Sequence, residues 1–179
     1  MYKKLNKNGF TLIELLAVIV IMGVLMMVAI PAMTRYIENA KRDVFADTAK
    51  KYISSARYTL LSDGYTCGGN DCGLTDLEPS GKVLVIPANN IELENETKKS
   101  PWGKTFDGTT AWITVRNVGT ADKPEYKYSF VGTDTSKNGI VTLTDEENIS
   151  RSVVKKSNSS NATSPCTSEA TCLKVTGLK

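Results

Sequence analysis

The sequence predicts an α+β fold in which one long N-terminal helix packs on a small antiparallel β-sheet domain. Three observations predict it. An apolar run occupies residues 10–33, an amphipathic pattern with helical periodicity follows over 34–62, and segments rich in β-branched and aromatic residues lie between 111 and 154. With residues 10–33 set aside as a segment long and apolar enough for a membrane, the remaining length suits one globular domain over 34–179.

The apolar run begins at Phe10 and ends at Met33, and Glu14 is its only ionisable residue. A helix of this length measures about 36 Å, which is enough to cross a hydrocarbon layer about 30 Å thick. Two simpler interpretations are an ordinary secretory signal and a plain membrane anchor. The run is too long for the first, and the second leaves unexplained a carboxylate that costs about 2.5–3.5 kcal/mol in a bilayer. Glu14 therefore requires a partner.

Helical periodicity continues beyond the apolar run, so we expect residues 34–62 to form the amphipathic half of the same helix and to pack on the domain. Gly64 and the two residues before it supply a stop signal. Gly23 and Pro31 lie inside this helix and weaken it, by about 1 and about 3 kcal/mol relative to alanine. An independent amphipathic helix that starts after a loop at Pro31 is the alternative.

Between the helix and the sheet, residues 63–110 are expected to form a loop with short pieces of structure. The stretch 64–73 is rich in glycine and holds two cysteines, which predicts a tight surface loop. Residues 82–87 are a candidate short strand that ends in proline. The segment 100–106 reads Ser-Pro-Trp-Gly-Lys-Thr-Phe, and its proline and glycine predict a rigid turn that holds Trp102 on the domain core.

The region 111–154 predicts a three-stranded or four-stranded antiparallel meander, because its β-rich segments are separated by turn residues. The expected strands are 111–117, 125–131 and 140–144. Val153 is a candidate start of another strand. Residues 155–179 are expected to form a C-terminal loop, since serine, asparagine and threonine dominate its first part.

The four cysteines fall into two close pairs, Cys67 with Cys72 and Cys166 with Cys172. Four cysteines allow three pairings, and two short local disulfides are the most economical arrangement for a domain exported from the cell. Free thiols and crossed pairs are the alternatives. A zinc site made of all four is disfavoured, because the short paired spacings typical of such sites are missing.

The composition excludes several classes of function. The chain has no histidine, which excludes Ser/His/Asp and Cys/His catalysis and removes the commonest general base. No glycine-rich phosphate loop is found in the sequence. We therefore expect no enzymatic activity and no cofactor. The formal charge of +3 falls to zero without the lysines of residues 1–9, which argues against a strongly basic nucleic-acid binder.

A partial calcium-binding pattern lies in the second half of the chain. Asp134, Asn138 and Asp145 fall at spacings that partly fit a calcium loop. The flanking segments are strand-like and not helical, so a hairpin turn is the favoured interpretation and calcium is the weaker alternative.

The N-terminal motif resembles a known family. Residues 7–14 read Lys-Asn-Gly-Phe-Thr-Leu-Ile-Glu, which is similar to the class III signal of type IV prepilins and the related pseudopilins. The segment 100–106 is similar to the Asp-Pro-Trp-Gly-x-x-Tyr segment of major pseudopilins and many Gram-positive pilins, with Ser100 replacing the acid and Phe106 the tyrosine. The resemblance covers residues 1–33 strongly and the remainder only in general plan.

The resemblance implies a pilin fold and a particular processing step. Residues 1–9 would be a leader peptide that a membrane prepilin peptidase removes by cleavage between Gly9 and Phe10. The new terminus at Phe10 would then be N-methylated. Residues 10–33 would remain on the mature protein as the membrane or filament-core half of the helix.

The resemblance also implies how subunits assemble. Glu14 would act in assembly, and a neighbour's cationic Phe10 amine could neutralise it in a low-dielectric bundle, where such a pair interacts more strongly than in water. The helix between Gly23 and Pro31 is often extended or unwound in filaments of the family, so we expect it to lose regular structure on assembly. The alternative is that this glycine and this proline are simply tolerated, as they commonly are in membrane helices.

The function implied is that of a structural subunit of a bacterial type IV pilus, made by self-polymerisation and used for adhesion, aggregation or twitching motility. The implied partners are prepilin peptidase, the membrane, the assembly platform and, indirectly, motor ATPases. The subunit would lie in the cytoplasmic membrane before assembly and in an extracellular filament afterwards. A pseudopilin of a secretion or DNA-uptake system, a minor pilin and a membrane-anchored binding domain of another class are the alternatives.

Overall fold

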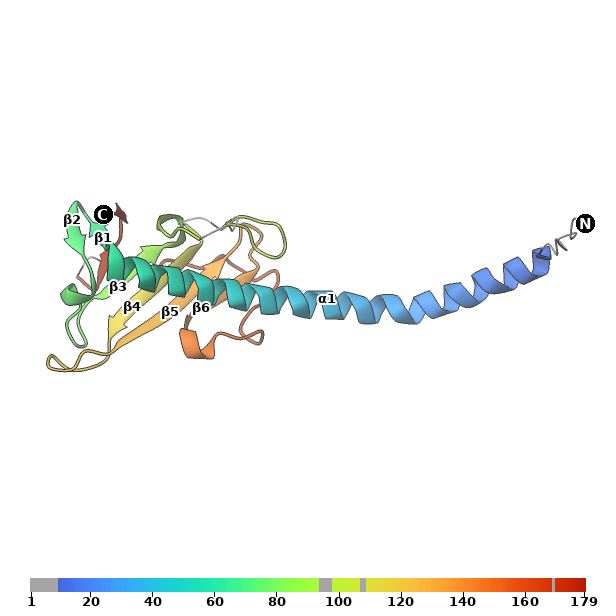
Figure 1. Ribbon diagram of the computed structural model, residues 1–179, viewed down its shortest axis with the longest axis horizontal. Helices are drawn as coiled ribbons and strands as arrows, with labels where there is room; N and C mark the ends of the chain where they lie inside the picture. The colour runs from blue at the N-terminus through green and yellow to red at the C-terminus, as the bar shows by residue number, and fades with distance from the viewer. Residues whose placement is uncertain (1–9, 94–97, 107–108, 169) are drawn as a thin grey trace, which may run out of the picture. The chain divides into compact units, whose positions relative to one another are not determined.

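The computed structural model describes residues 10–93, 98–106, 109–168 and 170–179 (Figure 1). The helix and strands are α1 (Leu12–Ser62), β1 (Tyr65–Cys67), β2 (Asn70–Cys72), β3 (Val83–Pro87), β4 (Ala111–Asn117), β5 (Tyr126–Thr133), β6 (Gly139–Asp145), β7 (Cys172–Lys174) and β8 (Gly177–Leu178). The expectation of one long helix and an antiparallel-rich sheet domain is confirmed. The chain forms two compact units, Met1–Asn39 and Ala40–Lys179.

Helix α1 runs without interruption through Pro31, so the alternative of a separate helix after a loop at that residue is wrong. Pro31 has no N–H to donate to the carbonyl one turn earlier. One turn on, the Thr34 hydroxyl donates to the Ile30 carbonyl oxygen at 3.0 Å. The helix ends at the predicted stop signal, where Gly64 adopts a φ of 81° and its N–H donates to the Thr59 carbonyl oxygen at 2.7 Å.

The part of α1 that belongs to the domain unit buries one face. Its buried side chains recur at helical spacing and are Phe45, Ala46, Ala49, Tyr52, Ile53, Ala56 and Leu60. Two aromatic residues on this face contact the sheet, since the ring centroids of Tyr52 and Phe45 lie 6.3 and 6.4 Å from that of Phe130. Figure 1 shows this part of α1 lying across the sheet.

The main sheet has five strands in the order β6-β5-β4-β3-β7. All neighbours are antiparallel except β3 and β7, which are parallel. Strands β4, β5 and β6 confirm the predicted meander, and β3 confirms the short strand expected at residues 82–87. Ser129 pairs with Asp145 and Thr133 with Gly139, so the β5–β6 turn lies at the opposite end of the strands from the β4–β5 loop.

Both faces of this sheet carry apolar side chains. Residues such as Leu84, Ile113 and Phe130 join the main core that α1 covers. On the other face, Val85, Trp112, Val131, Ala162 and Cys172 form a second buried cluster. The second face is therefore covered by the C-terminal segment, which brings Ala162 and Cys172 to it.

Several short strands lie where a loop was expected. The stretch 64–73 contains the hairpin of β1 and β2, and β8 pairs with β1 to complete a three-stranded sheet. The C-terminal residues 155–179 contain β7 and β8. No strand begins at Val153 within the described residues, and the chain there makes only an isolated bridge between Lys155 and Gly139.

The buried face of α1 generates a stability prediction. The Phe45 side chain is fully buried, whereas 53% of the neighbouring Val44 side chain is exposed. Phe45→Ala should lower the free energy of unfolding of the domain by about 3–5 kcal/mol, because it leaves a cavity among aromatic rings. Thermal and urea denaturation of the detergent-solubilised chain measure this loss.

Val44→Ala is the matched control, since it shortens an exposed side chain one residue away on the same helix. It should change stability by no more than about 0.5 kcal/mol. Equal effects of the two substitutions would contradict the assignment of this helix face to the core.

Candidate functional site

Helix α1 begins with a reciprocal cap made by Thr11 and Glu14. The Thr11 backbone N–H donates to Glu14 Oε2 at 2.8 Å, the Thr11 hydroxyl donates to the same oxygen at 2.9 Å, and the Glu14 N–H donates to the Thr11 hydroxyl at 3.4 Å. This is a capping box, which supplies partners for donors that the first helical turn leaves unpaired. Thr11 was not among the predicted site residues, although Thr-x-x-Glu before an apolar run is the recognisable signal of such a cap.

Within the described part of the single chain, the Glu14 carboxylate is capped but is not paired with a cation. Both bonds from Thr11 end on Oε2. Among the described residues, no lysine or arginine makes an ion pair with Glu14. Capping therefore explains how the side chain is oriented, but it supplies no cation.

Glu14 stands on a helix surface that is otherwise apolar. From Leu12 to Met33 every side chain is exposed in the single chain. This part of α1 is long and apolar enough to cross a membrane, by length and composition. Such a surface is not stable in water and requires a cover of lipid or of other apolar helices. Phe10, at the end of this segment, is also exposed, whereas Gly9 lies outside the described residues.

Gly23 and Pro31 both lie inside the continuous part of α1. A Cβ atom added to Gly23 would meet no atom within 4 Å, so packing within the chain does not require glycine there. The two residues therefore mark a stretch that is helical in the single chain although its intrinsic helix propensity is low.

The cysteines form two local disulfides, Cys67–Cys72 and Cys166–Cys172. The first closes the β1–β2 hairpin. The second joins the C-terminal loop to the start of β7, and it lies beside the second core cluster. Both are therefore structural cross-links of the domain, and no described cysteine is free.

Of the three candidate calcium ligands, Asp134 and Asn138 are in contact, whereas Asp145 lies apart from them. Asp134 lies at the β5–β6 turn, whereas Asp145 lies at the other end of β6, opposite Ser129. The Asp145 carboxylate instead accepts from both Ser129 and Arg116, the latter at 2.9 Å. The described residues contain no cluster of three or more acidic or cysteine side chains that could hold a metal. Asp134 and Asn138 therefore lie in the turn of the β5–β6 hairpin, and Asp145 lies outside that turn.

The buried Asp134 carboxylate organises this turn. It accepts from the Ser100 hydroxyl at 2.6 Å, from the backbone N–H groups of Ser136 and Asn138, and from the Asn138 side-chain amide at 2.9 Å. Ser100 belongs to the segment around Trp102, whose ring centroid lies 5.9 Å from that of Phe45. The predicted role of this segment, holding an aromatic ring on the core, is confirmed.

A shallow groove beside α1 is lined by charged side chains, most of which are paired. The Arg57 guanidinium pairs with Glu146 and lies 4.4 Å from the centroid of the Tyr128 ring. Burial raises the pKa of Tyr128, and the nearby Arg57 opposes the rise only in part. The groove holds a volume of about 310 Å³. Three of the carboxylates that line it are paired, Glu146 with Arg57, Glu147 with Lys127 and Asp145 with Arg116. Glu125 lines the groove as well.

Comparisons with known proteins bear on the N-terminal segment and on the chain as a whole. Residues 4–30 match the family model described as the prokaryotic N-terminal methylation motif. The chain is also 31% identical over 148 residues to a fimbrial protein of Neisseria meningitidis serogroup B. The aligned residues make up 74% of this chain and 86% of the relative. No solved structure matches the chain.

The Asp134 network generates a prediction about stability and calcium. Asp134→Ala should lower the free energy of unfolding by about 1–3 kcal/mol, because it leaves buried donors without an acceptor. Calcium at millimolar concentration should leave the melting temperature of the unaltered chain unchanged. Circular dichroism melts with calcium and with a chelator measure both effects.

Asp122→Ala is the control, since Asp122 is exposed in the loop between β4 and β5. It should leave the melting temperature within about 1–2 °C of the original, because surface substitutions change stability little. A melting temperature that rises with calcium, and no longer does so in the Asp134 variant, would restore the calcium site.

Proposed function

The chain belongs to the type IV pilin family of fimbrial proteins and is a structural subunit of a pilus, and from this premise we propose how it is processed and how its copies assemble. It is not an enzyme. The observation that carries the proposal is Glu14, the one ionisable side chain on an exposed apolar helix, which has no cationic partner among the described residues.

In the proposal, prepilin peptidase cuts between Gly9 and Phe10 and removes the basic leader 1–9. Cleavage creates an amine at Phe10, which is then N-methylated and remains cationic. This step adds the missing charge within a few residues of Glu14. The apolar segment stays on the mature protein, because the cut precedes it, and it holds the subunit in the cytoplasmic membrane until assembly.

Assembly then pairs Glu14 of one copy with the Phe10 amine of another. Packed helices lie about 8–10 Å apart, so side chains and termini of neighbours can meet. The Thr11–Glu14 cap favours this pairing, because it fixes the carboxylate beside the first turn of the helix, where the amine of a neighbour at similar height would lie. Loss of one partner from a buried ion pair typically costs about 3–5 kcal/mol.

We also propose what happens to the helix in the filament and what the filament does. The helix between Gly23 and Pro31 loses regular structure when the filament forms, as its low helix propensity favours. A filament map with unbroken helix through these residues would contradict this. The platform and motor ATPases add subunits at the base, and the surface filament serves adhesion, aggregation or twitching motility.

A finer assignment within the family is also proposed. The segment at 100–106, whose Trp102 packs against the core of this domain, supports kinship with pilins of Gram-positive type. The comparisons do not favour the pseudopilin alternative. A long surface filament, as opposed to a short one confined to the cell envelope, is the observation that supports the pilus over it.

A crossed pair of variants tests the role of Glu14. Glu14→Gln keeps a side-chain oxygen for the cap but removes the charge, since glutamine also serves in a capping box. It should reduce the yield of sheared filaments at least tenfold while the subunit stays in the membrane. Thr11→Ala removes the capping hydroxyl but keeps the charge, and it should reduce the yield far less.

The comparison is made by immunoblotting sheared filaments and membranes from the same cells. Normal filament yield from Glu14→Gln would refute the pairing. A larger loss from Thr11→Ala than from Glu14→Gln would assign Glu14 to capping alone.

Processing is tested on the native protein itself. We expect its intact mass and N-terminal sequence to begin at Phe10 and to carry one N-methyl group. Substitution of Gly9 should leave the leader attached and should abolish filaments. Native protein that still begins at Met1 would contradict both the cleavage and the pairing that depends on it.

A further inference from the structure

Four exposed lysines lie on loops that meet at one end of the domain. Lys99 and Lys104 belong to a tight turn in which the Ser100 N–H donates to the Lys104 carbonyl oxygen at 2.6 Å. Lys137 is in the β5–β6 turn, and Lys155 follows it along the chain. We call these four residues the lysine cluster. All four side chains are exposed.

Backbone contacts join the loops that carry the lysine cluster. The Thr135 N–H donates to the Thr105 carbonyl oxygen at 3.2 Å, which links the turn of Lys99 and Lys104 to the turn of Lys137. Lys155 forms an antiparallel bridge with Gly139, two residues after Lys137. Lysines that are far apart in the sequence are therefore placed on adjoining loops.

These loops surround Phe45, near the start of the domain part of α1. The Phe45 ring centroid lies 5.3 Å from that of Phe106 and 5.9 Å from that of Trp102, both in the segment of Lys99 and Lys104. A Cβ atom on Gly139 would lie 2.6 Å from Phe45 Cζ, so the β5–β6 turn also touches this ring. The lysine cluster thus lies at the end of the domain where the unit begins, at Ala40.

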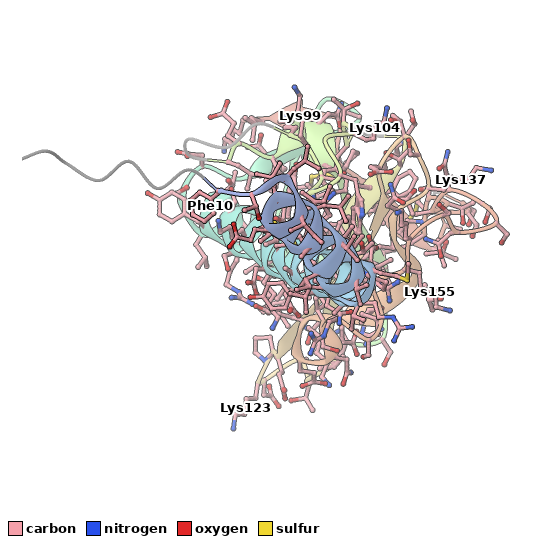
Figure 2. The ribbon with its side chains drawn as sticks, turned by 90° about the vertical axis from the view of Figure 1, so that its right-hand side faces the viewer. Phe10, Lys99, Lys104, Lys123, Lys137 and Lys155 are labelled. Carbon is pink, nitrogen blue, oxygen red and sulfur yellow. A yellow bond between two sulfur atoms is a disulfide. The ribbon has the colours of Figure 1, made fainter. Side chains whose placement is uncertain are left out.

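The charge of the lysine cluster is not neutralised within the described part of the chain. No described carboxylate makes an ion pair with any of its four ammonium groups. Lys137 Nζ donates only to the carbonyl oxygen of Ser159, at 3.3 Å. In Figure 2 Lys99 and Lys104 lie at the top of the picture, Lys137 and Lys155 lie at its right-hand side, and Lys123 lies at the bottom.

The chain connects this end of the domain to the apolar segment over a short distance. Met33 ends the apolar run and Ala40 begins the domain unit, and the residues between them are helical. Seven helical residues span about 10 Å. The headgroup layer on each side of a bilayer is about 5–8 Å thick. A subunit anchored by residues 10–33 therefore keeps this end of its domain close to the headgroups.

We propose that the lysine cluster binds the phosphate groups of anionic phospholipids while the subunit waits in the membrane. The inference rests on the proposed membrane stage and goes beyond it, because it assigns the domain a lipid contact of its own. Lysine ammonium groups bind phosphate as point charges. Near an anionic surface each lysine strengthens binding about fivefold, and salt weakens the attraction.

The position of the cluster favours lipid over nucleic acid. A strand of DNA could meet basic residues anywhere on the domain, whereas these lysines gather at the end that the anchor holds near the membrane. A neighbouring subunit is the remaining candidate. It would cover the cluster whatever the charge of the lipid, so lipid charge is the variable that separates these partners.

The experiment measures how fast each lysine is acetylated in vesicles. The processed full chain is reconstituted into phosphatidylcholine vesicles, with and without about 30% phosphatidylglycerol, and brief acetylation is read by peptide mass spectrometry. We expect the four lysines to react several-fold more slowly in the anionic vesicles and to recover in 0.5 M NaCl. Lys123, in the β4–β5 loop, is exposed at the other end of the sheet and should react equally in both.

A pair of variants separates the lysine cluster from charge in general. Lys104→Gln with Lys137→Gln should abolish most of the phosphatidylglycerol-dependent protection of Lys99 and Lys155, whereas Lys123→Gln should leave it intact. Unchanged melting temperatures of the variants show that the domain remains folded.

Other outcomes overturn the proposal in distinguishable ways. Equal protection in neutral and anionic vesicles would indicate a neighbouring subunit, and protection only on addition of DNA would indicate nucleic acid. A chain that floats with the vesicles but shows no protection refutes the lipid contact alone. A chain that fails to float refutes the membrane stage and this inference with it.

Discussion

A single carboxylate on an otherwise apolar helix surface is the constraint on which the organisation of this chain depends. A membrane can cover the apolar side chains from Leu12 to Met33 but cannot satisfy the charge on Glu14 at low cost. A bundle of copies can do both. The cap from Thr11 fixes where the helix begins and therefore where the Glu14 carboxylate lies.

The same helix serves two environments in succession. Its first part exposes apolar residues on all sides, which suits lipid or other helices, whereas from Phe45 onward only one face is apolar and buried. The sheet beneath this face is apolar on both sides and so needs two covers. Helix α1 supplies one, and the C-terminal segment that the Cys166–Cys172 disulfide joins to β7 supplies the other.

Sequence reasoning was reliable where a pattern extends over many residues. The length of α1, its end at Ser62 just before Gly64, and the strands β3 to β6 follow from periodicity and turn residues. It was unreliable for β1, β2, β7 and β8, because strands of two or three residues show no alternation and are defined by their partners. The short disulfide loops concealed them further, since glycine and cysteine are typical of loops.

The candidate site shows the same division. Glu14 was found because it interrupts a long apolar run, and the role of Thr11 could have been found from the spacing of the two residues. The partners of Asp134 could not, since Ser100 reaches it from a distant segment of the chain. The lysine cluster was equally hidden, because its members are scattered along the sequence and the side-chain charges of residues 10–179 sum to zero. Only the meeting of their loops around Phe45 reveals a local concentration of charge.

The final residues of the chain complete both sheets, and this affects the order of folding. Cys172 pairs with Val83 and Leu178 pairs with Tyr65. One edge of β3 is therefore covered by β7, and one edge of β1 is covered by β8. Until β7 and β8 are in place those edges stay open, and open edges invite pairing with other chains. The domain is therefore complete only when β7 and β8 have paired, so two very short strands protect the edges of two strands that lie far earlier in the chain.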